Sequence, residues 1–221
     1  MIELKCEALI FDLDGVLVDS AAAVEHAWSM WANQHSLDVH TVMTVAHGRR
    51  TLETVGLMAP HLNAVLETEQ IEAKAAIDPN GVMVMGGAVS LLRSIPPRRW
   101  AIATSGTHGV AVNRIQLAGL PMPQVLVTGN DVRKGKPDPE PYLLAASRLG
   151  VNPEACVVFE DAPAGIQSGR SAGMRVIAIA STHAVDGLGH ATVIARQLTD
   201  IHVLADKSST NRLIVRVQEM Q

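Results

Sequence analysis

The sequence of 221 residues lacks several features that would assign it to a particular class of protein. Its net charge of −4 offers no basic surface for nucleic acid, and no apolar run approaches the roughly 20 residues that span a bilayer. Glu3, Lys5 and Glu7 interrupt the apolar residues at the start, which is unlike a secretory signal peptide. We therefore expect a cytoplasmic protein that binds neither nucleic acid nor membranes, as a monomer or a small homo-oligomer.

Cysteine is scarce, and histidine shows no metal-binding spacing. Cys6 and Cys156 each adjoin a predicted buried strand, so we expect two small buried apolar residues, with a disulfide or a catalytic thiol as the alternatives. The nine histidines form no HxxxH or HExxH pattern, so a zinc site lacks support. Apolar residues make up 48% and charged residues 18%, as in an ordinary globular protein with one core and room for a small insert.

Short apolar runs alternate with helical patterns over most of the chain. The strand-like runs are residues 8–11, 101–104, 125–128, 157–159 and 176–179. Helical patterns occupy residues 87–95, 107–117 and 141–149, and a further helix begins near residue 164. Gly119 and Gly150 follow two of these helices, as is common at helix C-termini. This alternation predicts an α/β fold built on a mostly parallel sheet.

Residues 19–85 interrupt the alternation. Helical patterns at 20–35, 42–47, 51–58 and 62–77 follow one another without a strand-like run between them. We interpret residues 18–85 as an all-helical cap inserted into a core of residues 1–17 and 86–221, with linkers near 16–19 and 80–87. Trp28 and Trp31 have helical spacing with Val24 and Ala27, which favours the interior of the cap over a platform that stacks on sugars.

Polar side chains follow three of the predicted strands, at the sheet edge where α/β proteins bind ligands. Asp12 and Asp14 follow the first strand, Ser105 another, and Glu160 and Asp161 a third. Paired acids at the end of a buried strand repel each other and cost desolvation, so a divalent cation is the natural compensation. For an isolated Asp-x-Asp-Gly, a calcium-type loop or a hydrophilic turn is the alternative.

Four motifs occur in order: DLDG at 12–15, AIATSGT at 101–107, KGKPDPEPY at 134–142 and VFEDAPAGI at 158–166. With them the chain resembles the haloacid dehalogenase superfamily, in its branch of phosphatases with a helical cap after the first strand. The stretches 47–51, 100–107, 130–132, 135–142 and 158–166 further resemble the sugar- and polyol-phosphate phosphatases, including those for glycerol phosphate and 2-deoxysugar phosphates. The resemblance spans essentially the whole chain. It implies a Rossmann-like core, a small phosphorylated sugar or polyol as substrate, and Mg²⁺ as cofactor.

The resemblance also implies a two-step reaction with separate roles for the two acids. Asp12 would attack phosphorus as the nucleophile and form an aspartyl-phosphate, while Asp14 would act as general acid and then as general base. Because they are two residues apart, both side chains would face one phosphate if the strand were extended through them. Asp12, Glu160, Asp161 and the backbone carbonyl of Asp14 would hold the magnesium ion. Asp161 has an alternative role as a helix N-cap.

Lys136 and Ser105 complete the implied site. Lys136 would bridge the nucleophile and the phosphate and keep Asp12 ionised, whereas Lys134 fits the solvated surface position that is the usual one for lysine. Ser105 and the backbone N–H of Gly106 would bind phosphate oxygens. The alternative for Ser105 is an N-cap of the following helix, a position that itself suits phosphate.

The cap loop around Gly48 carries several charged side chains. His47, Arg49, Arg50 and Glu53 surround this glycine, and such groups can hydrogen-bond the hydroxyls of a sugar or polyol. We expect Arg49 and Glu53 to touch the substrate. A charged helix N-terminus on the surface is the open alternative.

Other activities fit the sequence less well. A sugar phosphomutase of the superfamily would place an arginine in the cap loop where Thr51 stands, and a dehalogenase would lack the second acid, Asp14. A cation-pumping ATPase would need membrane spans. A ligand-binding protein without turnover is disfavoured, because the matched acids and Lys136 are all present. The sequence therefore predicts a magnesium-dependent phosphatase for small sugar or sugar-alcohol phosphates.

Overall fold

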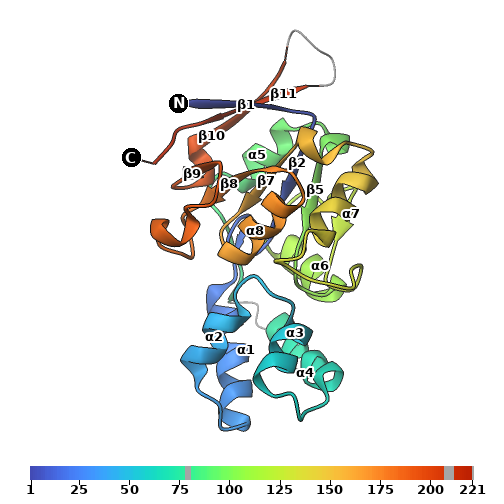
Figure 1. Cartoon of the computed structure of the whole chain (residues 1–221), viewed down its shortest axis with the longest axis vertical. Coiled ribbons are helices and arrows are strands. Elements are labelled where there is room, and N and C mark those ends of the chain that lie inside the picture. The colour runs from blue at the N-terminus through green and yellow to red at the C-terminus, as the bar shows by residue number, and fades with distance from the viewer. Residues whose placement is uncertain (78–80, 207–211, 221) are drawn as a thin grey trace.

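The computed structural model describes residues 1–77, 81–206 and 212–220, and comprises a sheet-based core with four helices at one end (Figure 1). The core contains a six-stranded parallel sheet in the order β6-β5-β2-β7-β8-β9. Its strands are β2 (Ala8–Phe11), β5 (Trp100–Ala103), β6 (Leu126–Val127), β7 (Cys156–Glu160), β8 (Arg175–Ile179) and β9 (Val193–Ala195). The predicted α/β fold with a parallel sheet is confirmed.

Strand β2 lies inside the sheet between β5 and β7, and none of its four residues is exposed. Successive side chains of a strand point to opposite faces. Leu9 and Phe11 therefore pack with α5 (Ala88–Ser94) and α6 (His108–Leu117), and Ile10 packs on the other face with α7 (Glu140–Leu149) and α8 (Pro163–Ser171). Because helices cover both faces, these strands are continuous apolar runs.

Three strands that the sequence analysis did not predict form a separate antiparallel sheet. They are β1 (Ile2–Cys6), β11 (Leu213–Val217) and β10 (Ile201–Ala205), in the order β1-β11-β10. In β1, Leu4 and Cys6 are buried while Glu3 and Lys5 are exposed. A short strand with one solvated face alternates polar and apolar residues, so it has no continuous apolar run.

The helices α1 (Ala21–Gln34), α2 (Val39–Ala46), α3 (Thr51–Met58) and α4 (Ala64–Ile77) pack together beyond one edge of the sheet, and we call them the cap (Figure 1). Helix α2 begins earlier than predicted because Asp38 caps it and accepts a hydrogen bond from the Thr41 N–H. Trp28 and Trp31 are buried inside the cap, as predicted, with their rings edge to face. The indole N–H of Trp31 donates to Glu67, which satisfies its polar atom.

Two adjacent connections join the cap to the core. Strands β3 (Val18–Asp19) and β4 (Met83–Val84) pair antiparallel, and the Met85 N–H donates to the Leu17 carbonyl. The linkers predicted near 16–19 and 80–87 thus lie side by side, although residue 80 is outside the described residues. Backbone hydrogen bonds therefore also tie the two connections to each other.

Neither cysteine is placed for chemistry. Cys6 and Cys156 are buried, as expected, and burial raises the pKa of each thiol to about 12. At neutral pH neither forms the thiolate that a catalytic cysteine needs. Within the part of the chain that the structure describes, no helix is long and apolar enough to cross a membrane.

Candidate active site

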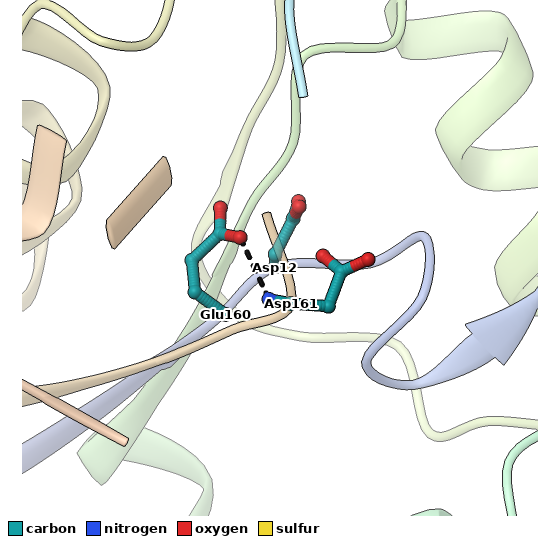
Figure 2. Close-up of side chains that lie close together, drawn as sticks. All are labelled: Asp12, Glu160 and Asp161. Carbon is teal, nitrogen blue, oxygen red and sulfur yellow. Dashed lines mark hydrogen bonds between the residues drawn. The ribbon is translucent and has the colours of Figure 1, made fainter. Parts of the chain in front are cut away.

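Three carboxylates gather where strands β2 and β7 end, at the sheet edge that faces the cap. Asp12 directly follows β2, Glu160 is the last residue of β7, and Asp161 comes next. Each offers an oxygen that lies within 4.8 Å of oxygens from the other two, and all three residues are buried (Figure 2). Polar groups from separate strands meet here as the sequence predicted, because the carboxyl ends of parallel strands share one edge.

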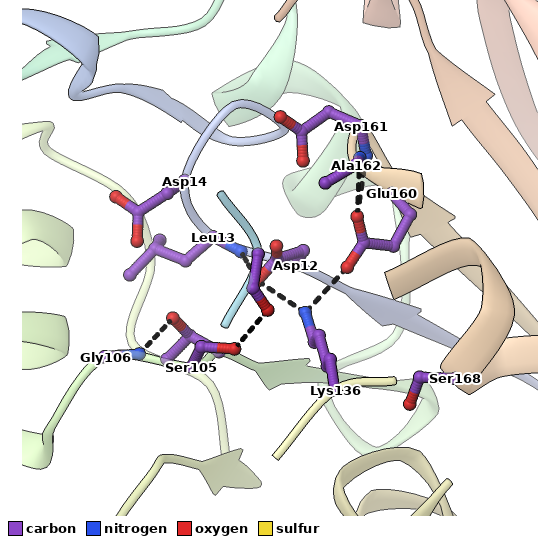
Figure 3. A network of polar contacts seen from close by, with 12 residues as sticks. Asp12, Leu13, Asp14, Ser105, Gly106, Lys136, Glu160, Asp161, Ala162 and Ser168 are labelled. Carbon is purple, nitrogen blue, oxygen red and sulfur yellow. Dashed lines mark hydrogen bonds and ion pairs between the residues drawn. The ribbon is translucent and has the colours of Figure 1, made fainter. Parts of the chain in front are cut away.

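Asp12 is 5% exposed and faces a single buried cation. Its Oδ1 lies 3.0 Å from Lys136 Nζ and accepts a hydrogen bond from the Leu13 N–H at 2.8 Å (Figure 3). Burial raises the pKa of Asp12 to about 8; Lys136 opposes that rise, and the charges of Glu160 and Asp14 add to it. Without a further positive charge, the carboxylate form of Asp12 is therefore disfavoured.

Lys136 lies entirely inside the protein, between Asp12 and Glu160. Its Nζ donates to Glu160 Oε1 at 2.7 Å and lies 5.0 Å from the centre of the Tyr142 ring. Burial alone would lower the pKa of Lys136, but the charges of Asp12 and Glu160 raise it above its usual value. Lys136 is thus a buried ammonium held by its partners, whereas Lys134 has a side chain 76% exposed, as expected.

The carboxylate of Glu160 uses all of its hydrogen-bonding capacity within the protein. Oε1 accepts from Lys136 and from the hydroxyl of Tyr142, and Oε2 accepts from the backbone N–H groups of Asp161 and Ala162. Four bonds fill the four lone-pair positions of a carboxylate. Burial would raise the pKa of Glu160, but Lys136 and these hydrogen bonds bring it below its usual value.

Two glycines make room for these acids. A Cβ at Gly165 would stand 1.7 Å from Glu160 Oε1, so any side chain there would displace the carboxylate. Gly15 adopts a φ of +78°, and a Cβ there would meet Asp161 Oδ2 at 2.0 Å. The glycine of the Asp-x-Asp-Gly motif therefore serves both the turn and the close approach of Asp161.

Asp161 is held from the other side by Thr182, whose hydroxyl donates to Oδ2. Burial raises the pKa of Asp161 well above its usual value, and the charges of Glu160 and Asp12 add to the rise. Asp161 does not act as an N-cap here: Ala162 is the N-cap residue of α8 and makes no side-chain cap bond. Among the described residues, three buried carboxyl groups thus share one ammonium, so their full ionisation would leave an excess of negative charge that a divalent cation can balance.

Asp14 does not face the same way as Asp12. Strand β2 ends at Phe11, and Asp14 lies in the following turn with its carboxylate directed away from Lys136 (Figure 3). Its Oδ1 accepts from Arg114 Nη1 at 2.6 Å and from the Ser20 hydroxyl at 2.5 Å. The expected extended geometry of the pair is wrong, because the turn begins before the second acid.

Arg114 was not singled out by the sequence analysis, although it carried a recognisable signal. It is 6% exposed and belongs to the buried face of α6, together with Val110, Ala111 and Ile115. A buried arginine at an apolar position of a helix requires a partner, and here the partner is the partly exposed carboxylate of Asp14.

Ser105 and Gly106 follow β5 and lie at the same sheet edge. The Ser105 hydroxyl donates to the carbonyl of Gly48 at 2.8 Å, and the Gly106 N–H donates to the Thr104 hydroxyl. Thr107, not Ser105, is the N-cap residue of α6. Ser105 thus connects the core to the cap loop in this structure.

A cavity of about 140 Å³ lies between this cluster and the cap. Its cap side is mostly apolar, with Val24, Trp28 and Ile71, and its polar wall includes Arg49 and Glu72. Ser105 and Gly106 also line it, as do both carboxylates of the Asp12–Asp14 pair. Among the described residues, Glu53 is not part of this wall.

Glu72 on α4 is a polar group that sequence reasoning missed. It lies at the cavity wall, where the hydroxyls of Thr107 and Thr51 donate to it. Burial raises the pKa of Glu72, and these hydrogen bonds oppose the rise. Thr51, which stands where a mutase would carry an arginine, thus brings an acid rather than a base to the cavity.

The comparisons with known proteins agree with the motifs. The family model of the haloacid dehalogenase-like hydrolases matches residues 6–173. Hexitol phosphatase A of Escherichia coli is 40% identical over 205 residues, which cover 90% of this chain and 95% of that protein. Glycerol-1-phosphate phosphohydrolase 2 of Saccharomyces cerevisiae is 36% identical, with 85% and 80% covered.

Solved structures show the same fold. β-Phosphoglucomutase from Clostridium difficile superposes with a TM-score of 0.76 over 87% of this chain and 91% of that one, at 24% identity. At that identity the likeness concerns the fold alone.

Proposed function

The chain belongs to the haloacid dehalogenase-like hydrolases, and from this premise we propose that it is a magnesium-dependent phosphatase of small sugar or sugar-alcohol phosphates. The observation that carries the proposal is the contact of Asp12 with Lys136. Asp161 lies beside this pair, and a small cavity lined by the cap lies next to it. Relatives named for hexitol and glycerol-1-phosphate support the substrate class.

Asp12 is the nucleophile of the proposed reaction. One of its oxygens attacks phosphorus, the bond from phosphorus to the alcohol oxygen breaks, and an aspartyl-phosphate forms. Water then attacks phosphorus, which releases phosphate and regenerates the carboxylate. Lys136 supports this role because its ammonium contacts Asp12 and favours the ionised form. Ser105 and Gly106 line the cavity beside it, and they bind the phosphate oxygens once the Ser105 hydroxyl leaves the Gly48 carbonyl and the Gly106 N–H leaves the Thr104 hydroxyl.

Asp14 is the general acid that protonates the leaving alcohol and then the base that takes a proton from water. Its carboxylate lines the cavity and its side chain is 28% exposed, so it can reach a ligand there. To act, it exchanges its contacts with Arg114 and Ser20 for one with the leaving oxygen.

The donor set at the cluster fits a magnesium ion, which prefers oxygen ligands. Asp12 and Asp161 each use one oxygen in the bonds described above, which leaves the other for a cation, and the carbonyl of Asp14 lies in the same turn. Glu160 belongs to the same cluster but reaches a cation only by giving up one of its hydrogen bonds. When bound, the ion offsets carboxylate repulsion and neutralises charge on the phosphate.

The residues of the cavity wall favour a leaving alcohol that carries hydroxyl groups and no second phosphate. Glu72 accepts hydrogen bonds and would repel a second phosphate, whereas hydroxyl groups can donate to it. Arg49 lies at the same wall and can bind the hydroxyls or the phosphate itself. A phosphomutase must hold a second phosphate, but Thr51 stands where it would carry an arginine and donates to the carboxylate of Glu72, which leaves Arg49 as a cation elsewhere on this wall.

The direct test is release of phosphate from a panel of hexitol, hexose, 2-deoxyhexose, glycerol and nucleotide phosphates, with and without magnesium. We expect magnesium-dependent release from sugar or polyol phosphates and none from Asp12→Asn. Beryllium fluoride should attach to Asp12 as a mimic of the phosphoryl group. Normal binding of these compounds without release of phosphate would refute the proposal.

A further inference from the structure

We infer that Arg50 and Glu53 are positioning residues that latch the cap onto the core loop that leads to Lys136. This inference rests on the proposed function only for its kinetic consequence. The latch consists of the side chains of Arg50 and Glu53 and the loop of residues 129–135, and it lies outside the substrate cavity.

Arg50 donates to three backbone carbonyls of that loop. Nη1 lies 3.3 Å from the carbonyl oxygen of Gly129 and 2.8 Å from that of Val132, and Nη2 lies 2.7 Å from that of Arg133. Arg50 is the N-cap residue of cap helix α3, so these bonds join two parts of the chain about 80 residues apart. A planar guanidinium can reach several carbonyls at once, whereas a lysine ammonium is a single point.

Glu53 closes the arrangement from the same turn of helix. Its Oε1 accepts from Arg50 Nη2 at 2.6 Å and from the backbone N–H of Gly135 at 2.9 Å. The carboxylate thus neutralises the half-buried guanidinium and adds its own contact to the residue directly before Lys136. The expected contact of Glu53 with the substrate stays a prediction, and in this structure Glu53 contacts the backbone of the core.

The core loop is shaped to receive the latch. A Cβ at Gly135 would lie 2.7 Å from Arg50 Cγ and 2.8 Å from Glu53 Oε2. Because Gly135 has no side chain, the cap can approach its backbone closely. The close approach of the cap to this loop therefore depends on the residue types on both sides. A chance contact between two surfaces would not need such a match.

Closure of the cap and placement of Lys136 are coupled by this geometry. The latch holds both Gly135 and the carbonyls before it, and the next residue carries the ammonium that contacts Asp12. When the cap turns away on its paired linkers, the loop loses four hydrogen bonds to the cap. Lys136 is then supported by its partners in the core alone.

A matched control is available in Arg148. It belongs to α7 and holds the same core loop from within the core through the carboxylate of Asp131, and it also donates to the carbonyl of Leu126 in β6. Loss of Arg148 weakens the loop without touching the cap. The two arginines therefore separate support of the loop from coupling to the cap.

The experiment measures amide hydrogen exchange in the substrate-free protein and steady-state kinetics with a hexitol phosphate. Arg50→Ala should raise exchange about tenfold in both segments 47–53 and 129–135, because charge-assisted bonds are lost on each side. Arg148→Ala should raise exchange in the core loop only. Arg50→Ala should lower kcat about tenfold or more, and added guanidinium ion should restore part of it, whereas Arg50→Lys should not.

Glu53→Gln keeps the acceptor oxygen and removes the charge, so it should fold and show an intermediate loss of kcat. Unchanged exchange in segment 129–135 of both Arg50→Ala and Glu53→Gln would overturn the inference. So would an equal opening of segment 47–53 in Arg148→Ala. The exchange pattern does not depend on turnover: if the wild-type protein released no phosphate and the pattern held, the proposed function would fail while the latch would stand.

Discussion

Replacing Asp12 by Asn should abolish turnover and at the same time stabilise the metal-free protein at neutral pH. Burial raises the pKa of Asp12 in the folded protein to about 8, from an ordinary value of 3.8. Between these values the unfolded chain loses the proton while the folded protein keeps it. The contribution of Asp12 to the free energy of unfolding is therefore fully present below pH 3.8 and is lost as the pH rises toward 8.

The size of this effect follows from the two pKa values. Each pH unit in the window costs about 1.36 kcal/mol, so at pH 7 the metal-free protein loses up to about 4 kcal/mol through Asp12. Asparagine is close in shape to the protonated acid and has no proton to lose. Asp12→Asn should recover most of this free energy at pH 7 and almost none at pH 4.

Urea unfolding with a chelator present, at pH 4 and at pH 7, measures the difference. Carboxylates outside this cluster titrate alike in both proteins, so the gap between wild type and variant reports Asp12 together with Asp161 and Lys136, whose pKa values depend on its charge. Magnesium should stabilise the wild-type protein at pH 7 and leave the variant nearly unchanged, because the variant lacks one of the proposed ligands. A gap of equal size at both pH values, or none at pH 7, would refute the electrostatic reasoning.

Three further predictions concern other parts of the site. Tyr142→Phe removes one hydrogen bond to Glu160, so it should lower the free energy of unfolding by about 1 kcal/mol in urea. It should also lower kcat several-fold, because Glu160 holds Lys136 against Asp12. An unchanged kcat would contradict this connection from Tyr142 to Asp12. Glu72→Gln should alter the ranking of sugar phosphates while hydrolysis of acetyl phosphate stays the same; an unchanged ranking would exclude Glu72 from specificity. EDTA should abolish phosphate release and added magnesium should restore it; activity that survives chelation would contradict the metal site.

The strands that the sequence predicted are uninterrupted apolar runs of the parallel sheet, although β9, a run of three residues at its edge, was missed. Strand β2 begins and ends at the predicted residues, because all four of its residues are apolar and buried. Strands β1, β10 and β11 were missed because one face of their sheet is solvated. In β11 the polar Arg216 stands between the buried residues Val215 and Val217, and such a short alternation resembles a loop.

The parts of the site that could be predicted are those next to strand ends. Asp12, Glu160 and Asp161 are brought together by the parallel sheet alone, and Lys136 was assigned through the motif that contains it. Arg114 and Glu72 are different, because they lie on helices. The distance of Arg114 on α6 from the cluster is set by packing within the core, and that of Glu72 on α4 by packing between core and cap. Arg114 is 100 residues from Asp14 along the chain, so no local sequence pattern predicts their contact.

The two acids of the Asp-x-Asp pair are the same residue type, and they differ in the side chains that surround each of them. Asp12 is buried against Lys136, whose ammonium favours the carboxylate form while burial favours the protonated one. Asp14 contacts a different cation, Arg114, at the wall of the cavity, where a leaving group or a water can replace it. A nucleophile needs the first setting, because desolvation and a fixed counter-charge keep a reactive carboxylate in place. A proton carrier needs the second, because it must exchange protons with whatever occupies the cavity.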